Sequence, residues 1–146
     1  MDRQELLKKS YLFAGVTSDD LQALDAIAER RTYIAGDVVH SEGDVADAMY
    51  LIEMGAVDIV RKGKETVFAT IGSEQGFGEL SFFEPGPRPA SASVRERTYL
   101  LRIPYERLAK VFAERPALAL LVHRNACAFF AKHLRMMAHD LNHRYL

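Results

Sequence analysis

The segment Gln75–Ser91 carries the residues best suited to binding a ligand. Gly76 and Gly78 let the backbone bend closely around a bound group and leave N–H groups accessible to an anion. The planar guanidinium of Arg88 can donate two hydrogen bonds to a phosphate, and the Glu79 carboxylate can accept hydrogen bonds from sugar hydroxyls. The same residues also fit a surface β-turn whose flanking Glu79 and Arg88 pair with each other. The residues alone leave both interpretations open.

Other residue types that carry chemistry offer no comparable site. The single Cys127 excludes an internal disulfide and a multi-cysteine zinc site, and its apolar helical surroundings predict a buried thiol. His139 and His143 have helical i,i+4 spacing, but no carboxylate-rich motif surrounds them, so no metal site is predicted. His40 is the only histidine in the region of predicted strands, too few for the metal centre of a β-helix enzyme. We therefore expect neither an enzyme nor a cofactor.

Composition predicts one ordinary globular domain spanning residues 1–146. The chain is 49% hydrophobic and 27% charged, with a formal net charge of -1. Its 19 Lys+Arg balance 20 Asp+Glu, so we expect no nucleic-acid partner. The first residues carry charges throughout, and the longest apolar run, Pro116–Val122, is too short to span a membrane. We expect a cytoplasmic protein without a membrane anchor.

Hydrophobic spacing divides the chain into three parts. Residues 1–30 show the three-and-four spacing of short amphipathic helices, with one helix starting near Ser18 after capping residues. Residues 31–103 contain short β-branched or aromatic runs punctuated by glycines, which predict many strands joined by tight turns. The predicted strands are Thr32–Ile34, Val38–His40, Ala48–Glu53, Val57–Arg61, Thr66–Ile71 and Tyr99–Ile103. Residues 104–146 are predicted to be helical, with prolines at two helix starts. The fold class is therefore mainly β with flanking helices.

The last predicted helix starts at Pro116 and is long for a chain of this size. Its apolar positions have the alternating three-and-four spacing of a coiled-coil seam, at Cys127, Phe130, Leu134, Met137 and Leu141. The pattern favours a homodimer paired through this helix. Packing of the same stripe on the strands is the alternative.

The motif FGELSFF followed by PRPAS, with Arg88 nine positions after Glu79, resembles the phosphate-binding cassette of the cyclic-nucleotide-binding domain family. Further segments resemble other parts of that domain in the same order, namely Leu12–Val16, Ala35–Val39, Glu42–Asp44, Met49–Ile52 and Met54–Val57. The resemblance extends from about Leu6 to about Leu141. It implies a catabolite-activator-like β-roll: an antiparallel double-stranded, jelly-roll-like β-helix with N-terminal helices and a long C-terminal helix.

The resemblance also implies roles for individual residues. Glu79 would hold the ribose 2′-hydroxyl and Arg88 would neutralise the cyclic phosphate. The implied ligand-binding set is Gly78, Glu79, Leu80, Ser81, Arg88, Pro89, Ala90 and Ser91, and the implied base contacts are His133, Leu134 and Met137 on the long helix. Pro89 departs from the family, which usually has Ala or Ser there with an N–H for the phosphate. Losing one such donor costs about 1.5–3 kcal/mol, roughly ten- to a hundredfold in affinity.

Two functions follow as expectations. The first is a regulatory sensor for cAMP or cGMP whose ligand moves the C-terminal helix. The chain leaves no room after that helix for a helix-turn-helix, so the signal is expected to pass to a partner protein or through self-association. The second is a β-roll that no longer binds nucleotide and serves as a protein-interaction or scaffold module. Pro89 favours the second function, and the retained Glu79 and Arg88 favour the first.

Overall fold

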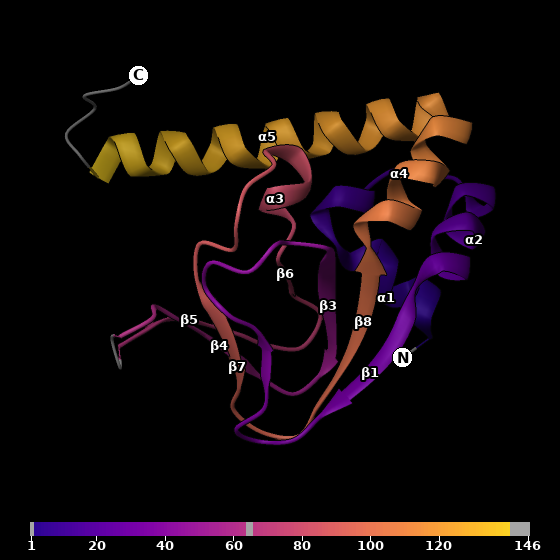
Figure 1. The fold of residues 1–146 in the computed structure, drawn as a ribbon. Coiled ribbons are helices and arrows are strands. Elements are labelled where there is room, and N and C mark those ends of the chain that lie inside the picture. Colours follow the sequence, from indigo (N-terminus) through magenta and orange to yellow (C-terminus); the bar gives the residue numbers. More distant parts are fainter. Residues whose placement is uncertain (1, 64–65, 141–146) are drawn as a thin grey trace.

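The structure is a computed structural model that describes residues 2–63 and 66–140. Two four-stranded sheets form a roll, and helices cover one of its sides (Figure 1). The N-terminal helices are α1 (Arg3–Lys9), the 3-10 turn η1 (Tyr11–Phe13) and α2 (Ser18–Ile27). The Thr17 hydroxyl accepts a hydrogen bond from the Asp20 N–H at 3.1 Å, which confirms the predicted helix start.

Every pairing in both sheets is antiparallel. The first sheet has the order β1 (Glu29–Tyr33), β8 (Thr98–Pro104), β3 (Ala48–Met54), β6 (Gly76–Phe77). The second has the order β2 (Val38–His40), β7 (Ser91–Val94), β4 (Val57–Val60), β5 (Val67–Ile71). The predicted β-roll with N-terminal helices and a long C-terminal helix is confirmed. Strands β6 and β7 were not predicted.

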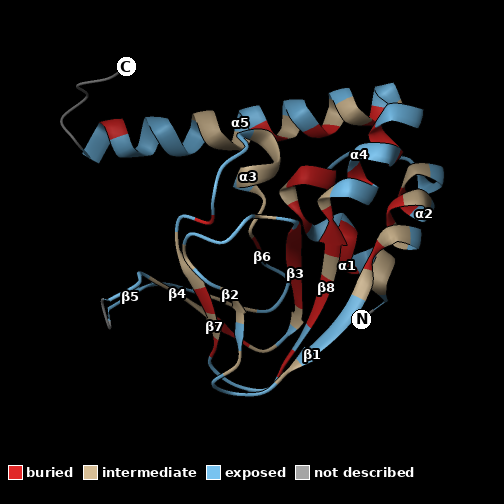
Figure 2. Ribbon diagram, in the orientation of Figure 1, coloured by how far each residue is buried: buried red, intermediate tan, exposed pale blue. Residues whose placement is uncertain are grey.

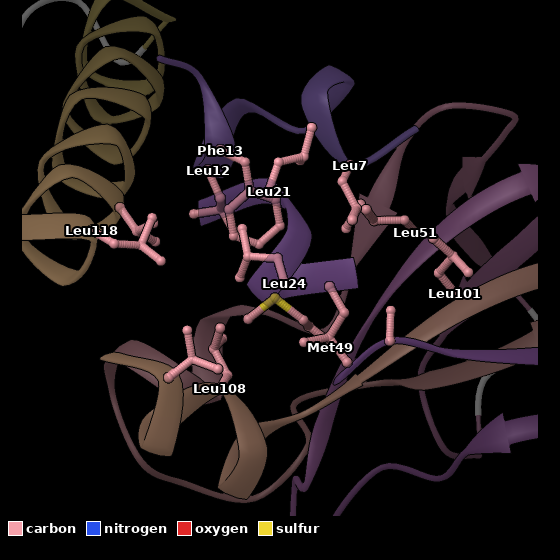
Figure 3. Close-up of a cluster of buried hydrophobic side chains, with 14 of the residues drawn as sticks. Leu7, Leu12, Phe13, Leu21, Leu24, Met49, Leu51, Leu101, Leu108 and Leu118 are labelled. Atoms are coloured by element: carbon pink, nitrogen blue, oxygen red, sulfur yellow. The ribbon is translucent and has the colours of Figure 1, made fainter. Parts of the chain in front are cut away.

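The central strand β3 is buried on both faces because its side chains alternate between two cores. Met49 and Leu51 point toward the helices, where they join a cluster built mainly of leucines (Figure 3). Ala48, Tyr50 and Ile52 point into the space between the two sheets. One strand therefore ties the helical layer to the interior of the roll.

Three helices complete the fold: α3 (Leu80–Phe83), α4 (Tyr105–Glu114) and α5 (Pro116–Asp140). Helix α5 runs over α3 and α4, and its C-terminal half extends beyond them (Figure 1). Exposed residues predominate in that half (Figure 2). Among the helices described, none has the length and apolar character required to cross a membrane.

Two expectations about helices were wrong. The apolar spacing from Asp2 to Phe13 predicts one short helix, but Ser10 adopts an extended backbone there, so α1 ends at Lys9 and Ser10 caps η1. Cys127 is exposed, not buried. Helix α5 packs through positions four apart, Leu118, Val122 and Ala126, and the next residue along a helix turns about 100° away from such a face.

Of the predicted coiled-coil seam, Phe130 packs against the helical core. Cys127, Leu134 and Met137 are exposed, the last two with 52% and 60% of their surface accessible. Leu141 lies outside the described residues. Pairing of two chains through α5 stays a prediction.

Candidate functional site

A cavity of about 240 Å³ lies where the segment from Gly76 to Ala90 folds back against the second sheet. Seven of the eight predicted ligand-binding residues line it, namely Gly78, Glu79, Leu80, Ser81, Arg88, Pro89 and Ala90. Ser91 does not. It lies in β7, and its hydroxyl accepts a hydrogen bond from the Glu42 N–H at 2.9 Å. Residues far apart in the chain, His40, Ile59 and Ile71, complete the wall.

Arg88 is the buried charge of this site, with 3% of its surface accessible. Its backbone pairs with the turn after β2, accepting from the Gly43 N–H and donating to the Asp44 carbonyl, each at 2.8 Å. Its guanidinium donates to the Gly78 carbonyl at 3.0 Å and to the Ala48 carbonyl at 2.6 Å. The alternative of a surface Arg88 paired with Glu79 is therefore wrong, because the guanidinium lies inside the roll.

The charge of Arg88 is only partly compensated. The Asp47 carboxylate is 4.0 Å away and 68% exposed, so water screens it strongly. A buried cation without a close counterion is costly. The site therefore favours an anion.

Gly78 is required for the approach of Arg88. Its φ of 81° lies in the left-handed region that side chains disfavour. A Cβ at this position would lie 2.9 Å from Arg88 Nη1. The Gly78 carbonyl also accepts a hydrogen bond from the Tyr105 hydroxyl, whose pKa burial raises to about 12. Glycine thus allows the backbone to pass directly beside the guanidinium.

Glu79 lies between this cavity and a second one of about 300 Å³ next to the N-terminal helices. Although Glu79 precedes α3, its side chain does not cap that helix. Instead, the Tyr11 hydroxyl donates to Glu79 Oε1 at 3.3 Å. Tyr11 in turn stacks on Phe129 of α5, with ring centroids 3.7 Å apart. The Glu79 carboxylate, directly before α3, is therefore connected through Tyr11 to α5.

His40, at the end of β2, has unsatisfied ring nitrogens. Within the described part of the chain, five buried side-chain polar atoms lack a hydrogen-bond partner. Two of them, Arg3 Nε and Asp25 Oδ1, form an ion pair with each other at 3.0 Å. The other three are both ring nitrogens of His40 and Nε of Arg88. Both residues line the same cavity.

Burial and the positive charge of Arg88 lower the pKa of His40 to about 4, against the opposite effects of Asp44, the Ala90 carbonyl and Asp47. The imidazole is therefore neutral near pH 7. A neutral imidazole has one N–H to donate and one nitrogen to accept.

Two aromatic residues of α3 connect the cassette to the C-terminal helices. The Phe82 ring packs edge-on against Phe112 of α4 at 5.7 Å between centroids. The Phe83 ring packs in the same way against His123 and Phe130 of α5, at 5.3 Å and 5.9 Å. A shift of the cassette backbone therefore changes how these two rings pack on α4 and α5.

The structure does not bring the three predicted base contacts to the cavity. His133 Nδ1 lies 3.0 Å from the Phe129 carbonyl of its own helix, and its ring packs on Phe129. Leu134 and Met137 face solvent. Their contact with a base stays a prediction. In the part of the chain that the structure describes, no three His, Cys, Asp or Glu residues are grouped closely enough to hold a metal ion. His143 lies outside that part.

Two residues of the site with polar side chains were not predicted to belong to it, Tyr11 and His40. Tyr11 is 68 positions from Glu79, and His40 reaches Arg88 only because the turn after β2 pairs with the Arg88 backbone. No spacing in the sequence indicates either contact. The lone strand histidine was the only available signal.

A family model and several known proteins match this chain. Residues 30–115 match the family model described as "Cyclic nucleotide-binding domain". The "Cyclic AMP receptor protein" of Thermus thermophilus is 33% identical over 132 residues, which are 88% of this chain and 59% of that protein. The "CRP-like cAMP-activated global transcriptional regulator" of Mycobacterium tuberculosis is 31% identical over 118 residues, which are 79% of this chain and 53% of the relative. The chain thus spans a little over half the length of these curated relatives.

A solved structure agrees with the sequence matches. The N-terminal domain of a transcriptional regulator from Streptomyces coelicolor superposes with a TM-score of 0.81 at 30% identity. The superposition covers 90% of this chain and 94% of that domain. The similarity therefore extends over both the roll and the helices.

Proposed function

This chain belongs to the cyclic nucleotide-binding domain family, and we propose that it binds cAMP or cGMP in the cassette cavity as a cytoplasmic, non-enzymatic regulatory module. The cyclic phosphate lies against Arg88, and a ribose hydroxyl donates to Glu79. The family membership supports this assignment, as do the two relatives named for cAMP.

One observation carries the proposal: in the described part of the chain, three of the five buried side-chain polar atoms without a hydrogen-bond partner belong to His40 and Arg88, which both line this cavity. Buried polar groups are almost always satisfied in folded proteins. A set of unsatisfied donors beside a buried positive charge is what an anionic ligand satisfies. The volume of about 240 Å³ lies below the roughly 300–1,000 Å³ of pockets that enclose whole drug-sized ligands. A cavity of this size suits the ribose and the cyclic phosphate of a nucleotide, with the nucleobase outside the cavity.

The output runs through α3 to α5. A phosphate that draws the Arg88 guanidinium from the Gly78 and Ala48 carbonyls changes the cassette backbone that carries Phe82 and Phe83. These rings pack on α4 and α5. The ligand then shifts the population of α5 positions by its differential affinity for them. The altered α5 acts on a partner protein or on a second copy of this chain.

A second function, a nucleotide-independent scaffold module, is favoured by two specific observations. Pro89 lines the cavity without an N–H to donate. Arg88 already donates to two backbone carbonyls, so the guanidinium supports the fold in the absence of ligand. In this function the buried arginine serves only to hold the cassette against β3.

Isothermal titration calorimetry with cAMP and cGMP separates the two functions. The natural protein should bind saturably, and Arg88→Ala should remove the binding. Arg97→Ala is the matched control, because Arg97 is exposed and does not line the cavity; it should bind as the natural protein does. Absence of heat and of any thermal shift at millimolar nucleotide contradicts the sensor and supports the scaffold.

A further inference from the structure

We propose that His40 is a ligand-binding residue that donates an N–H hydrogen bond to the phosphate, in place of the backbone N–H that Pro89 lacks. The inference rests on the proposed function and adds a residue to its site. It also predicts that binding strengthens as the pH falls.

The position of His40 is fixed by the roll. Its backbone pairs with Ala92 of β7. Its ring lies beside Tyr50 and Phe77, with centroids 6.3 Å and 6.0 Å away, and these two rings stack on each other at 5.0 Å. The imidazole therefore packs against two aromatic side chains in the interior, which restrict its rotation. It forms part of the cavity wall together with Arg88, Pro89 and Ala90.

Both ring nitrogens are buried, and neither makes a hydrogen bond of good geometry among the described residues. The Ala90 backbone beside the ring favours its protonated form, but such a contact satisfies one ring nitrogen at most, so the loss of hydration is incompletely compensated without ligand. The neighbouring Arg88 Nε is buried and unsatisfied as well. A negatively charged group between the two side chains satisfies both at once. A neutral occupant would leave the guanidinium charge uncompensated.

Pro89 explains why a side-chain donor is needed here. Its backbone carries no N–H, so the cavity loses a donor at the residue directly after Arg88. The His40 imidazole lies near the Ala90 carbonyl, one residue further along the chain. The side chain thus occupies the neighbourhood in which the backbone donor is missing.

The charges around His40 determine the sign of the pH effect. The cavity side carries Arg88 and Glu79, and a polar pocket on the other side of His40 is lined by charged and titratable groups: Arg31, Tyr33, Asp44, Asp47, Tyr50 and Arg102. Without ligand, burial and Arg88 keep the ring neutral near pH 7. A bound phosphate places a negative charge beside the ring and raises the pKa of His40 in the complex. Binding then takes up a proton, so affinity rises as the pH falls.

Calorimetric titration with cAMP and cGMP between about pH 5.5 and pH 8 tests the inference. We expect the natural protein to bind roughly tenfold more tightly at the lower pH. His40→Leu removes the donor and should weaken binding about tenfold or more. His40→Gln keeps an N–H donor that does not titrate, so it should bind but lose the pH dependence. His139→Gln changes an exposed histidine at the end of α5 and should keep that dependence.

The outcomes distinguish the inference from the function on which it rests. If the natural protein binds nucleotide while His40→Leu binds equally well with the same pH dependence, His40 is not a ligand contact and the proposed function stands. If the natural protein does not bind, both are overturned. NMR titration of the histidine rings in the natural protein needs no variant. Nucleotide should raise the pKa of His40, and an unchanged pKa in the saturated complex overturns the inference even if His40→Leu fails to fold.

Discussion

The Tyr11 hydroxyl donates a hydrogen bond to Glu79 Oε1 at 3.3 Å. This bond connects the N-terminal helices to the carboxylate that we propose accepts the ribose hydroxyl. Burial and the negative charge of Glu79 raise the pKa of Tyr11, so its hydroxyl stays protonated and acts as a donor. Because the bond occupies one carboxylate oxygen, it orients Glu79 and leaves Oε2 to the sugar.

Tyr11→Phe should therefore weaken nucleotide binding by about fivefold, roughly 1 kcal/mol, because Glu79 loses the hydrogen bond that orients it. The stacking on Phe129 is kept, so the free energy of unfolding should change by less than about 1 kcal/mol. Calorimetry and urea unfolding measure the two quantities. Tyr99→Phe, at an exposed position of β8, is the control. Equal or tighter binding by Tyr11→Phe would show that the bond does not prepare Glu79.

Gly78→Ala should abolish detectable binding and lower the free energy of unfolding by about 2–3 kcal/mol. The added Cβ lies 2.9 Å from Arg88 Nη1, and the residue keeps a φ of 81°. Gly36→Ala separates the effect of the steric contact from that of the positive φ. Gly36 has a φ of 94°, but no atom lies within 4 Å of its added Cβ. That control should lose about 1 kcal/mol of stability and retain binding. Similar affinities of the two variants would contradict a role for the close approach.

Pro89→Ala should strengthen binding by up to about tenfold, because it restores a backbone N–H at the edge of the cavity. Pro87→Ala adds an N–H two residues earlier. Pro87 pairs with Val45 in an isolated bridge and does not line the cavity, so this change should leave affinity unaltered. Weaker binding by Pro89→Ala would mean that the ring of the proline, not its missing N–H, matters at the site. Calorimetric titration of both variants with cAMP and cGMP measures the two affinities.

The cassette was predictable because its signals are local. Gly78, Glu79 and Arg88 lie within eleven consecutive positions, and their types alone indicate a close backbone approach, an acceptor and an anion-binding cation. The burial of Arg88 was not predictable, since it depends on the Ala48 carbonyl 40 positions away. The residues by themselves were equally compatible with a surface turn.

Contacts between distant segments account for the other differences between the predictions from sequence and the structure. Strand β7 (Ser91–Val94) consists mostly of small residues, and its extended form depends on pairing with β2 on one side and β4 on the other. Tyr11 and His40 belong to the site only through tertiary contacts. The prediction for Cys127 was wrong because an apolar stretch does not show which face of α5 packs on the roll.

Acid should destabilise the fold through His40. Its pKa falls from 6.5 to about 4 on folding, so the unfolded chain binds the proton more readily. The stability from the neutral ring is fully present above about pH 6.5 and is lost as the pH falls toward 4. Between about pH 7.5 and pH 4.5 the natural protein should lose roughly 2 kcal/mol more than His40→Gln, allowing for partial exposure of the ring. Urea unfolding of both proteins without nucleotide measures this difference. Parallel losses would mean that His40 titrates alike in the folded and unfolded chains.

Pairing of two chains through α5 can be tested with the only cysteine of the protein. Cys127 is exposed and lies on the predicted seam with Leu134 and Met137, which are 52% and 60% exposed. In a parallel pair, equivalent seam positions face each other across the two helices. Mild oxidation should therefore join two chains by a Cys127 disulfide, seen as a dimer on a non-reducing gel. The combined change Leu134→Glu and Met137→Glu places charges in the seam and should prevent the crosslink, while Cys127→Ser controls for other oxidation products. If the natural protein sediments as a monomer and does not crosslink, α5 must act on a different protein.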